Sequence, residues 1–352
     1  MRRTRWRSGS RALRRALVVA SLPAVTLPLA GCAQGGASSA TSLTVYSGQH
    51  VQTTQALVAA FERESGISVS LRSADEDILA DQIVTEGSNS PADVFYTENS
   101  PPLQYLASKG MLAQVDRATL ANTPSRFNSP DGRWVGVSAR VSVLVYNTSL
   151  LSRNDLPTSA MQLADPKWNG HVAIAGSETD FQPIVTSIAR TYGEQAALRW
   201  LDAVKANAGG SHDYPDNEPV TSQVNNGQVA LGLVNQYYWY RMRAEVGAAA
   251  THSAIAYFAP HDVGYVLNVS GAGVLRSSTH QKAAQRFVAF LTSTEGQEII
   301  AHSDSFEYPI ASGVTTAQPE TPFDQLQPND ISVEELGTGA EAIKLLQEAQ
   351  LL

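Results

Sequence analysis

Residues 229–239 of this chain read Val-Ala-Leu-Gly-Leu-Val-Asn-Gln-Tyr-Tyr-Trp. The apolar run and the Asn-Asn-Gly sequence just before it predict a buried strand, and Tyr237 and Tyr238 come where this strand ends. In open α/β sheets, ligands bind at the carboxyl ends of strands. The two phenols can therefore stack on an organic ligand or, once deprotonated, bind a hard cation. They can also serve only as packing against the aromatic residues that follow.

The first 31 residues differ in composition from the rest of the chain. They carry seven arginines and no acidic residue, and the apolar run 16–30 follows the last arginine. About 15 apolar residues are few for a membrane-spanning helix, and a basic flank before such a run is typical of an export signal. Residues 1–31 are therefore expected to be a signal peptide.

Cys32, the only cysteine, follows Leu-Ala-Gly and so resembles the lipidation site of a bacterial lipoprotein. The alternative is a plain secretory signal with a chance cysteine. We expect Cys32 to carry lipid and the Gly/Ser/Ala-rich residues 32–41 to form a flexible tether. This pattern predicts an extracytoplasmic protein anchored to the cell membrane.

The charge balance excludes several partners. Without the seven arginines of the signal, 18 basic and 33 acidic residues remain, a formal net charge of -15. Such an acidic protein is a poor partner for nucleic acid or anionic lipid. A single cysteine excludes internal disulfides and zinc-thiolate sites. The length of 352 residues favours two domains or one large one.

From residue 42 onward the hydrophobic pattern alternates between strand and helix. Strands are expected at 43–46, 67–71 and 93–97, with helices at 51–65 and around 78–84 between them and a third helix from 100 to about 109. Two successive strand-helix-strand units predict a mostly parallel sheet with right-handed connections.

A second α/β set is expected after residue 168. Its strands are predicted at 171–175 and 229–234, and its helices at 181–192, 194–206, 219–225 and 238–246. Helices at 281–291, 294–302 and 333–351 follow, the last after a Pro-rich stretch at 309–328.

Two long β-rich segments, 134–146 and 264–275, are interpreted as strands that cross between two lobes. We expect one lobe at 42–138 with 268–318 and the other at 139–267 with 319–352. Two α/β lobes joined by two hinge strands predict a ligand cleft between the lobes.

Three predicted strand ends carry side chains suited to a metal. His50 follows the first strand, Glu98 follows the third, and Tyr237 and Tyr238 follow a strand of the second lobe. If both lobes present these ends to one cleft, an imidazole, a carboxylate and two phenolates meet there. Such hard donors suit Fe(III) better than zinc or soft copper. Taken singly, His50 could bond backbone at a helix start, and Glu98 could be solvated.

Seven stretches resemble the bacterial ferric-ion-binding proteins, which are the substrate-binding components of iron ABC transporters. They are Val-Tyr-Ser-Gly-Gln-His at 45–50, Ser-Pro-Ala-Asp-Val-Phe-Tyr-Thr-Glu at 90–98, Pro-Lys-Trp at 166–168, Asn-Gln-Tyr-Tyr-Trp at 235–239, Phe-Val-Ala-Phe-Leu at 287–291, Glu-Gly-Gln at 295–297 and Glu-Tyr-Pro at 307–309. The resemblance implies a two-lobed periplasmic-binding-protein fold of type II that closes on one Fe(III). It also implies that the ligands are His50, Glu98, Tyr237 and Tyr238.

Four donors leave two positions of an octahedral ion open. In the family that the chain resembles, a synergistic anion such as phosphate often fills them, held by a small-residue turn and two asparagines. Asn217 and Asn235 match the asparagines, but this chain has Glu178-Thr179-Asp180 where the family tends to have a turn like Ser-Gly-Ala. Carboxylates at that turn would repel phosphate.

Two interpretations of this turn stay open. In the first, Glu178 or Asp180 supplies an internal oxygen to the metal, or the chain needs no phosphate. In the second, both side chains face solvent or cap the next helix, for which Asp180 is well placed. Arg140, on the first crossing strand, either balances charge at the cleft or is a plain surface residue.

The leading interpretation is a monomeric binding protein, not an enzyme, that delivers Fe(III) to the permease and ATPase of an ABC importer. An alternative on the same fold is a binder of a small organic ligand of polyamine or phosphonate type. A third is an exported metallohydrolase using His50 and Glu98, but the chain has neither His-Glu-x-x-His nor Gly-x-Ser-x-Gly.

Overall fold

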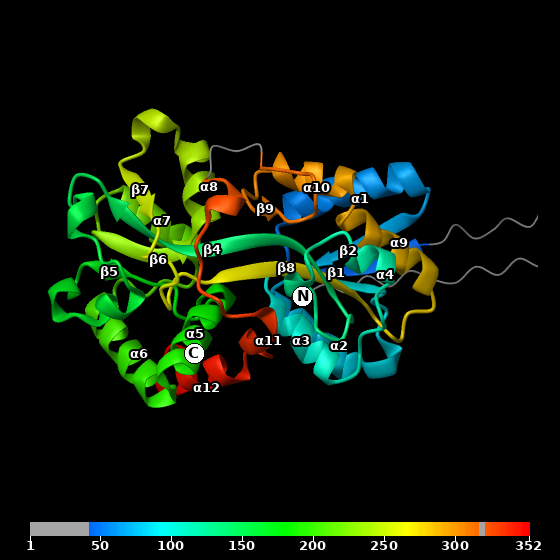
Figure 1. Ribbon diagram of the computed structural model, residues 1–352, viewed down its shortest axis with the longest axis horizontal. Coiled ribbons are helices and arrows are strands. Elements are labelled where there is room, and N and C mark those ends of the chain that lie inside the picture. Colours follow the sequence, from blue (N-terminus) through cyan, green and yellow to red (C-terminus); the bar gives the residue numbers. More distant parts are fainter. Residues whose placement is uncertain (1–41, 317–320) are drawn as a thin grey trace, which may run out of the picture. The chain divides into compact units, whose positions relative to one another are not determined.

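The computed structural model describes residues 42–316 and 321–352 (Figure 1). The predicted signal peptide, the tether and the lipidation site at Cys32 lie outside these ranges. In the two described ranges, no helix is long and apolar enough to cross a membrane.

The first half of the fold is built from alternating strands and helices, as predicted. Strands β1 (Ser42–Ser47), β2 (Ser68–Ser73) and β3 (Val94–Thr97) run parallel, with β1 in the middle. Helix α1 (Val51–Ser65) ends where Gly66 adopts a left-handed conformation. Helices α2 (Glu76–Glu86) and α3 (Ser100–Ser108) pack together on the side of the sheet opposite α1 (Figure 1). Because the strands are parallel, the loops after β1 and β3 lie at the same sheet edge.

Two long antiparallel strands connect this half to the second, which confirms the predicted crossing segments. Strand β4 (Val135–Asn147) pairs with β8 (Leu267–Val274) through its first part and with β6 (Leu231–Asn235) through its last part. The sheet order is β2-β1-β3-β8-β4-β6-β5. Figure 1 shows β4 and β8 running between the two groups of strands.

The second half follows the predicted order with shifted boundaries. It contains β5 (Val172–Ala173) and β7 (Ser253–Ala256), of which β7 was not expected from the sequence. Its helices are α5 (Gln182–Tyr192), α6 (Glu194–Ala208), α7 (Asn217–Asn225) and α8 (Gln236–Val246). Helix α8 begins two residues earlier than predicted, so both Tyr237 and Tyr238 lie in its first turn.

The C-terminal part corrects one prediction. Helices α9 (Gln281–Leu291) and α10 (Thr294–Ala301) lie where expected and are followed by β9 (Tyr308–Pro309). The single helix expected at 333–351 is instead α11 (Val333–Leu336) and α12 (Ala340–Glu348). The break falls at Gly337 and Gly339, whose φ angles of 61° and 76° are incompatible with a continuing right-handed helix. A short helix α4 (Arg117–Leu120) and several 3₁₀ turns complete the described fold.

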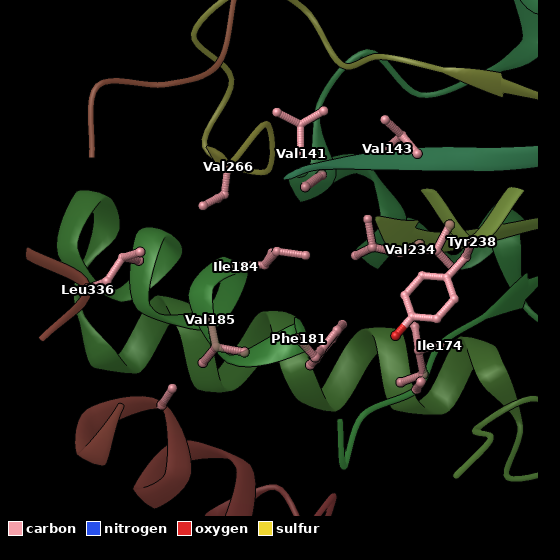
Figure 2. Close-up of a cluster of buried hydrophobic side chains, with 14 of the residues drawn as sticks. Val141, Val143, Ile174, Phe181, Ile184, Val185, Val234, Tyr238, Val266 and Leu336 are labelled. Atoms are coloured by element: carbon pink, nitrogen blue, oxygen red, sulfur yellow. The ribbon is translucent and has the colours of Figure 1, made fainter. Parts of the chain in front are cut away.

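The core of the second half includes the rings of Tyr237 and Tyr238. Ile174, Phe181, Val234 and Tyr238 belong to one buried cluster, and Figure 2 shows the Tyr238 ring among these aliphatic and aromatic side chains. Packing of the ring fixes the direction of its hydroxyl group. The phenol oxygen is thereby held in place for the contacts described next.

Candidate metal site

Tyr237 and Tyr238 direct both hydroxyl groups at one carboxylate. Their hydroxyl oxygens lie 2.9 and 3.0 Å from Asp180 Oδ2, and the ring centroids are 4.1 Å apart. Burial, followed by the charge of Asp180, raises the pKa of both phenols well above the ordinary value. Both phenols are therefore protonated in the metal-free protein. Their position in the first turn of α8 places them near the positive end of the helix dipole, which favours an anionic oxygen once a proton is lost.

Glu98 lies in the loop after β3, and three side chains from other elements contact its carboxylate. Its Oε1 accepts a hydrogen bond of 2.6 Å from Tyr237, and lies 3.2 Å from His50 Nε2 and 3.3 Å from Arg140 Nη2. The structure thus brings His50, Glu98 and the tyrosine pair together, as the strand-end argument predicted. Their role as metal ligands stays a prediction.

His50 lies just before the first residue of α1, with its ring 5.0 Å from that of Tyr237 in an edge-to-face arrangement. Burial lowers the pKa of His50 well below its ordinary value, and the charges of Arg241 and Arg140 lower it further. The imidazole is therefore neutral at physiological pH. A neutral imidazole is the form that binds a metal ion.

Asp180 lies inside the site, so the interpretation of this residue as a helix cap is wrong. Helix α5 begins at Gln182, its cap position is Phe181, and no side chain caps it. Asp180 is buried instead, and besides the two phenols it accepts a hydrogen bond of 3.1 Å from Asn99 Nδ2.

Glu178 is half-buried and lines the cavity beside the site. Burial, followed by the charges of Asp180, Asp216 and Glu218, raises its pKa to about 8. No hydrogen bond joins its side chain to the phenols in the described part of the chain. Of the two acidic residues in this turn, Asp180 is the one hydrogen-bonded to the tyrosine pair.

Arg140 is completely buried, so the interpretation as a surface arginine is wrong. Its guanidinium lies 3.3 Å from Glu98, 3.4 Å from Glu307 and 4.0 Å from Asp180. Burial lowers its pKa, but Glu307 and Asp180 outweigh burial and leave the pKa above the ordinary value. The site therefore contains a permanent positive charge among three carboxylates.

Glu307, just before β9, is a site residue that the sequence argument did not single out. Its Oε2 accepts hydrogen bonds from Ser138 Oγ at 2.8 Å and Gln49 Nε2 at 3.0 Å, whereas its buried Oε1 accepts none from the described residues. Ligand atoms of His50, Glu98 and Glu307 all lie within 4.8 Å of one another, close enough to share one metal ion. The only sequence signal was the Glu-Tyr-Pro stretch that matched the family.

Glu76 and Asn99 hold the loop that carries Glu98. Glu76 Oε2 accepts the backbone N–H groups of Glu98 and Asn99, both at 2.8 Å, and Oε1 accepts Asn99 Nδ2 at 2.8 Å. Asn99 thus links Glu76 in the first half to Asp180 in the second. No sequence pattern indicated either residue, because their partners lie in distant parts of the chain.

Asn217 and Asn235 are buried at the start of α7 and at the end of β6. Within the described ranges, no side-chain hydrogen bond joins either of them to His50, Glu98 or the tyrosine pair. Their role in holding an anion stays a prediction.

A cavity of about 670 Å³ lies over the cluster and is lined by both halves of the fold. The first half contributes His50, Glu98 and the start of α2, and the second contributes Glu178 and Tyr238. The predicted cleft between two α/β units is therefore present.

Residues 89–331 match the bacterial extracellular solute-binding protein family. The chain belongs to this family. The Fe(3+)-binding periplasmic protein of Serratia marcescens is 37% identical over 332 residues, which are 94% of this chain and 97% of that protein. The major ferric iron-binding protein of Neisseria meningitidis serogroup A is 35% identical over 339 residues, 96% and 98% of the two chains.

Solved structures of similar proteins agree with this membership. Iron-bound HitA from Pseudomonas aeruginosa is 38% identical, with a TM-score of 0.82 over 88% of this chain and 99% of that one. The Trichodesmium protein IdiA (FutA), in complex with iron and citrate, is 29% identical, with a TM-score of 0.76 over 88% and 100%. The predicted type II solute-binding fold is confirmed, as is an extracytoplasmic location. Membership also implies an ABC transporter as partner.

Proposed function

We propose that this solute-binding protein captures one Fe(III) ion with His50, Glu98, Tyr237 and Tyr238 and delivers it to the permease and ATPase of an ABC importer. The observation that carries the proposal is the convergence of two buried phenols, a carboxylate and a neutral imidazole from both halves of the fold. A trivalent ion would displace the two phenol protons, because its charge stabilises the phenolates far better than burial opposes them. The names of the relatives in Serratia and Neisseria support the same ligand.

Asp180 is proposed as a fifth ligand in place of an external anion. Its Oδ2 already contacts both phenol oxygens, so a metal ion bound by these phenolates would lie within reach of the same carboxylate. A phosphate ion at that position would meet the charge of Asp180, with Glu178 nearby. Asn217 and Asn235 are left as the residues that could hold an anion if one is used.

Iron release is proposed to follow from separation of the lobes. Tyr237, Tyr238 and Asp180 come from one half and His50 and Glu98 from the other, so opening divides the donors into two incomplete sets. We take the lobes to be 42–138 with 268–318 and 139–267 with 319–352.

The mature protein is further proposed to be a non-enzymatic monomer anchored by lipid on Cys32.

The test is a visible absorption titration of the purified protein with Fe(III), with and without phosphate. A phenolate-to-iron charge-transfer band is expected, and Tyr238→Phe should remove most of it. Phosphate should leave the wild-type band unchanged and should alter the band of Asp180→Asn. If the wild type gives no band under any condition, the iron proposal is wrong and a small organic ligand becomes the better candidate.

A further inference from the structure

Acidic side chains outnumber basic ones among the residues that line the cavity over the metal cluster. Six acidic residues line it: Asp75, Glu76, Asp77, Glu98, Glu178 and Glu218. Apart from the neutral His50, Arg241 is the one basic side chain among the described lining residues. A ligand that reaches the cluster through this cavity passes these acidic residues (the entrance).

Arg241 offsets only one of these acidic residues. Its Nη1 lies 3.1 Å from Glu218 Oε1, so its charge is already paired. An anion entering the cavity would find no unpaired cation there.

The cluster beneath the cavity offers donor atoms that suit a metal cation. Glu307 Oε1 and His50 Nε2 are buried and accept or donate no hydrogen bond among the described residues, although Arg140 Nη2 lies 3.4 Å from Glu307 Oε1 and Glu98 Oε1 lies 3.2 Å from His50 Nε2. Both atoms belong to groups close enough to share an ion with Glu98. Asp180 adds a further carboxylate, which contacts the hydroxyl groups of Tyr237 and Tyr238.

We propose that the entrance selects the chemical form of the iron, an inference that rests on the proposed function. It admits Fe(III) as a hydrated or hydroxide-bound cation or from a neutral chelate, and it excludes polyanionic chelates such as ferric citrate. Clefts lined by one sign of charge change the arrival rate of charged ligands by about 10- to 1,000-fold. A chelate that keeps its carboxylates would also have to bring them beside the acidic residues of the entrance, with no free cation there to pair with.

The test compares two iron sources: the neutral complex of Fe(III) with one nitrilotriacetate, and ferric citrate in excess radiolabelled citrate. Loading is followed by stopped-flow absorption of the charge-transfer band, and retained citrate is counted after gel filtration. The entrance variant combines Asp75→Asn, Asp77→Asn and Glu218→Gln. The matched control combines Asp202→Asn, Asp324→Asn and Glu64→Gln, which make the same change in net charge at exposed residues outside the cavity.

The wild type is expected to load from nitrilotriacetate, to load slowly from citrate and to retain no citrate. The entrance variant should load from citrate at least about tenfold faster than the wild type, and the control should not. Added salt should speed the wild type's loading from citrate, because screening weakens the repulsion. This measurement uses the wild type alone and so does not depend on the folding of a variant.

Two results would overturn the inference alone: citrate retained with iron by the wild type, or loading from citrate that neither salt nor the entrance variant accelerates. Absence of a charge-transfer band from either iron source would instead overturn the proposed function. The two failures are therefore distinguishable.

Discussion

Arg140 decides how three buried carboxylates can coexist beside the tyrosine pair. Its guanidinium faces Glu98, Asp180 and Glu307, which come from three different parts of the chain. Removing one partner from a buried charge group leaves the others unpaired, which is far costlier than losing a surface ion pair. Arg140 is therefore expected to matter for folding before it matters for binding.

We predict that Arg140→Met lowers the free energy of unfolding by about 3–5 kcal/mol. Arg140→Lys keeps the charge but loses the planar fork, so it should cost clearly less. Urea unfolding of the iron-free protein measures both. Equal losses in the two variants would show that shape rather than charge is what the site requires.

At the scale of elements, close contact between the loop after β1 and the start of α2 positions His50. A Cβ added to Gly48 would lie 2.5 Å from Glu76 Cβ and 2.8 Å from Glu76 Cα. No ordinary side-chain movement relieves a contact with backbone. Gly48, two residues before His50, therefore lies against Glu76, whose carboxyl group holds the Glu98 loop.

Gly48→Ala is expected to weaken Fe(III) binding and to destabilise the fold, because the loop must move away from Glu76. Gly66→Ala is the matched control. Its φ is +71° and its surroundings are open, so it should cost about 1 kcal/mol through backbone strain and leave iron affinity unchanged. Iron titration and urea unfolding of both variants separate the two effects, and unchanged affinity in Gly48→Ala would argue against positioning by this contact.

Glu76 also gives a prediction about pH. Burial raises its pKa to about 8, with Asp77 adding to the rise and the N–H donors of Asn99 opposing it. Because the folded state holds the proton more tightly than the unfolded state, this contribution to stability is full below the ordinary pKa and is lost as pH rises towards 8.

The stability of the wild type minus that of Glu76→Gln should therefore fall between about pH 5 and 8, by at most about 1.4 kcal/mol per pH unit. Urea midpoints of the iron-free proteins at several pH values provide the measurement. A difference that stays constant with pH would mean that Glu76 is ionised throughout, held by its three N–H donors.

At the scale of the whole molecule, the hydrogen bonds of the site join the two halves. Tyr237 of α8 contacts Glu98 of the first half, and Asn99 of that half contacts Asp180 of the second. A ligand bound at this junction stabilises the folded state as a unit, by about 2.7 kcal/mol when free ligand is at 100 times its Kd.

Fe(III) is accordingly expected to raise the thermal midpoint in one cooperative transition, with no early melting of either half. Tyr237→Phe should remove most of the rise, because it takes away a donor at the junction and leaves the ring in place. Differential scanning calorimetry with and without iron measures this. Two separate transitions in the iron-loaded wild type would contradict a shared site.

Sequence by itself determined the order of strands and helices, since hydrophobic periodicity and glycine stops are local. It also placed His50, Glu98 and the tyrosine pair at strand ends, which a parallel sheet gathers at one edge. It missed the break at Gly337 and Gly339 because glycine occurs in helices as well as at their ends.

Only the tertiary structure decided what surrounds those four residues. Asp180 meets Tyr237 across 57 residues, and Gln49 meets Glu307 across 258. The burial of Arg140 among three carboxylates arises in the same way, from contacts between elements distant along the chain. Local pattern carries no information on such contacts, because they depend on how two packed halves meet rather than on the residues beside each position.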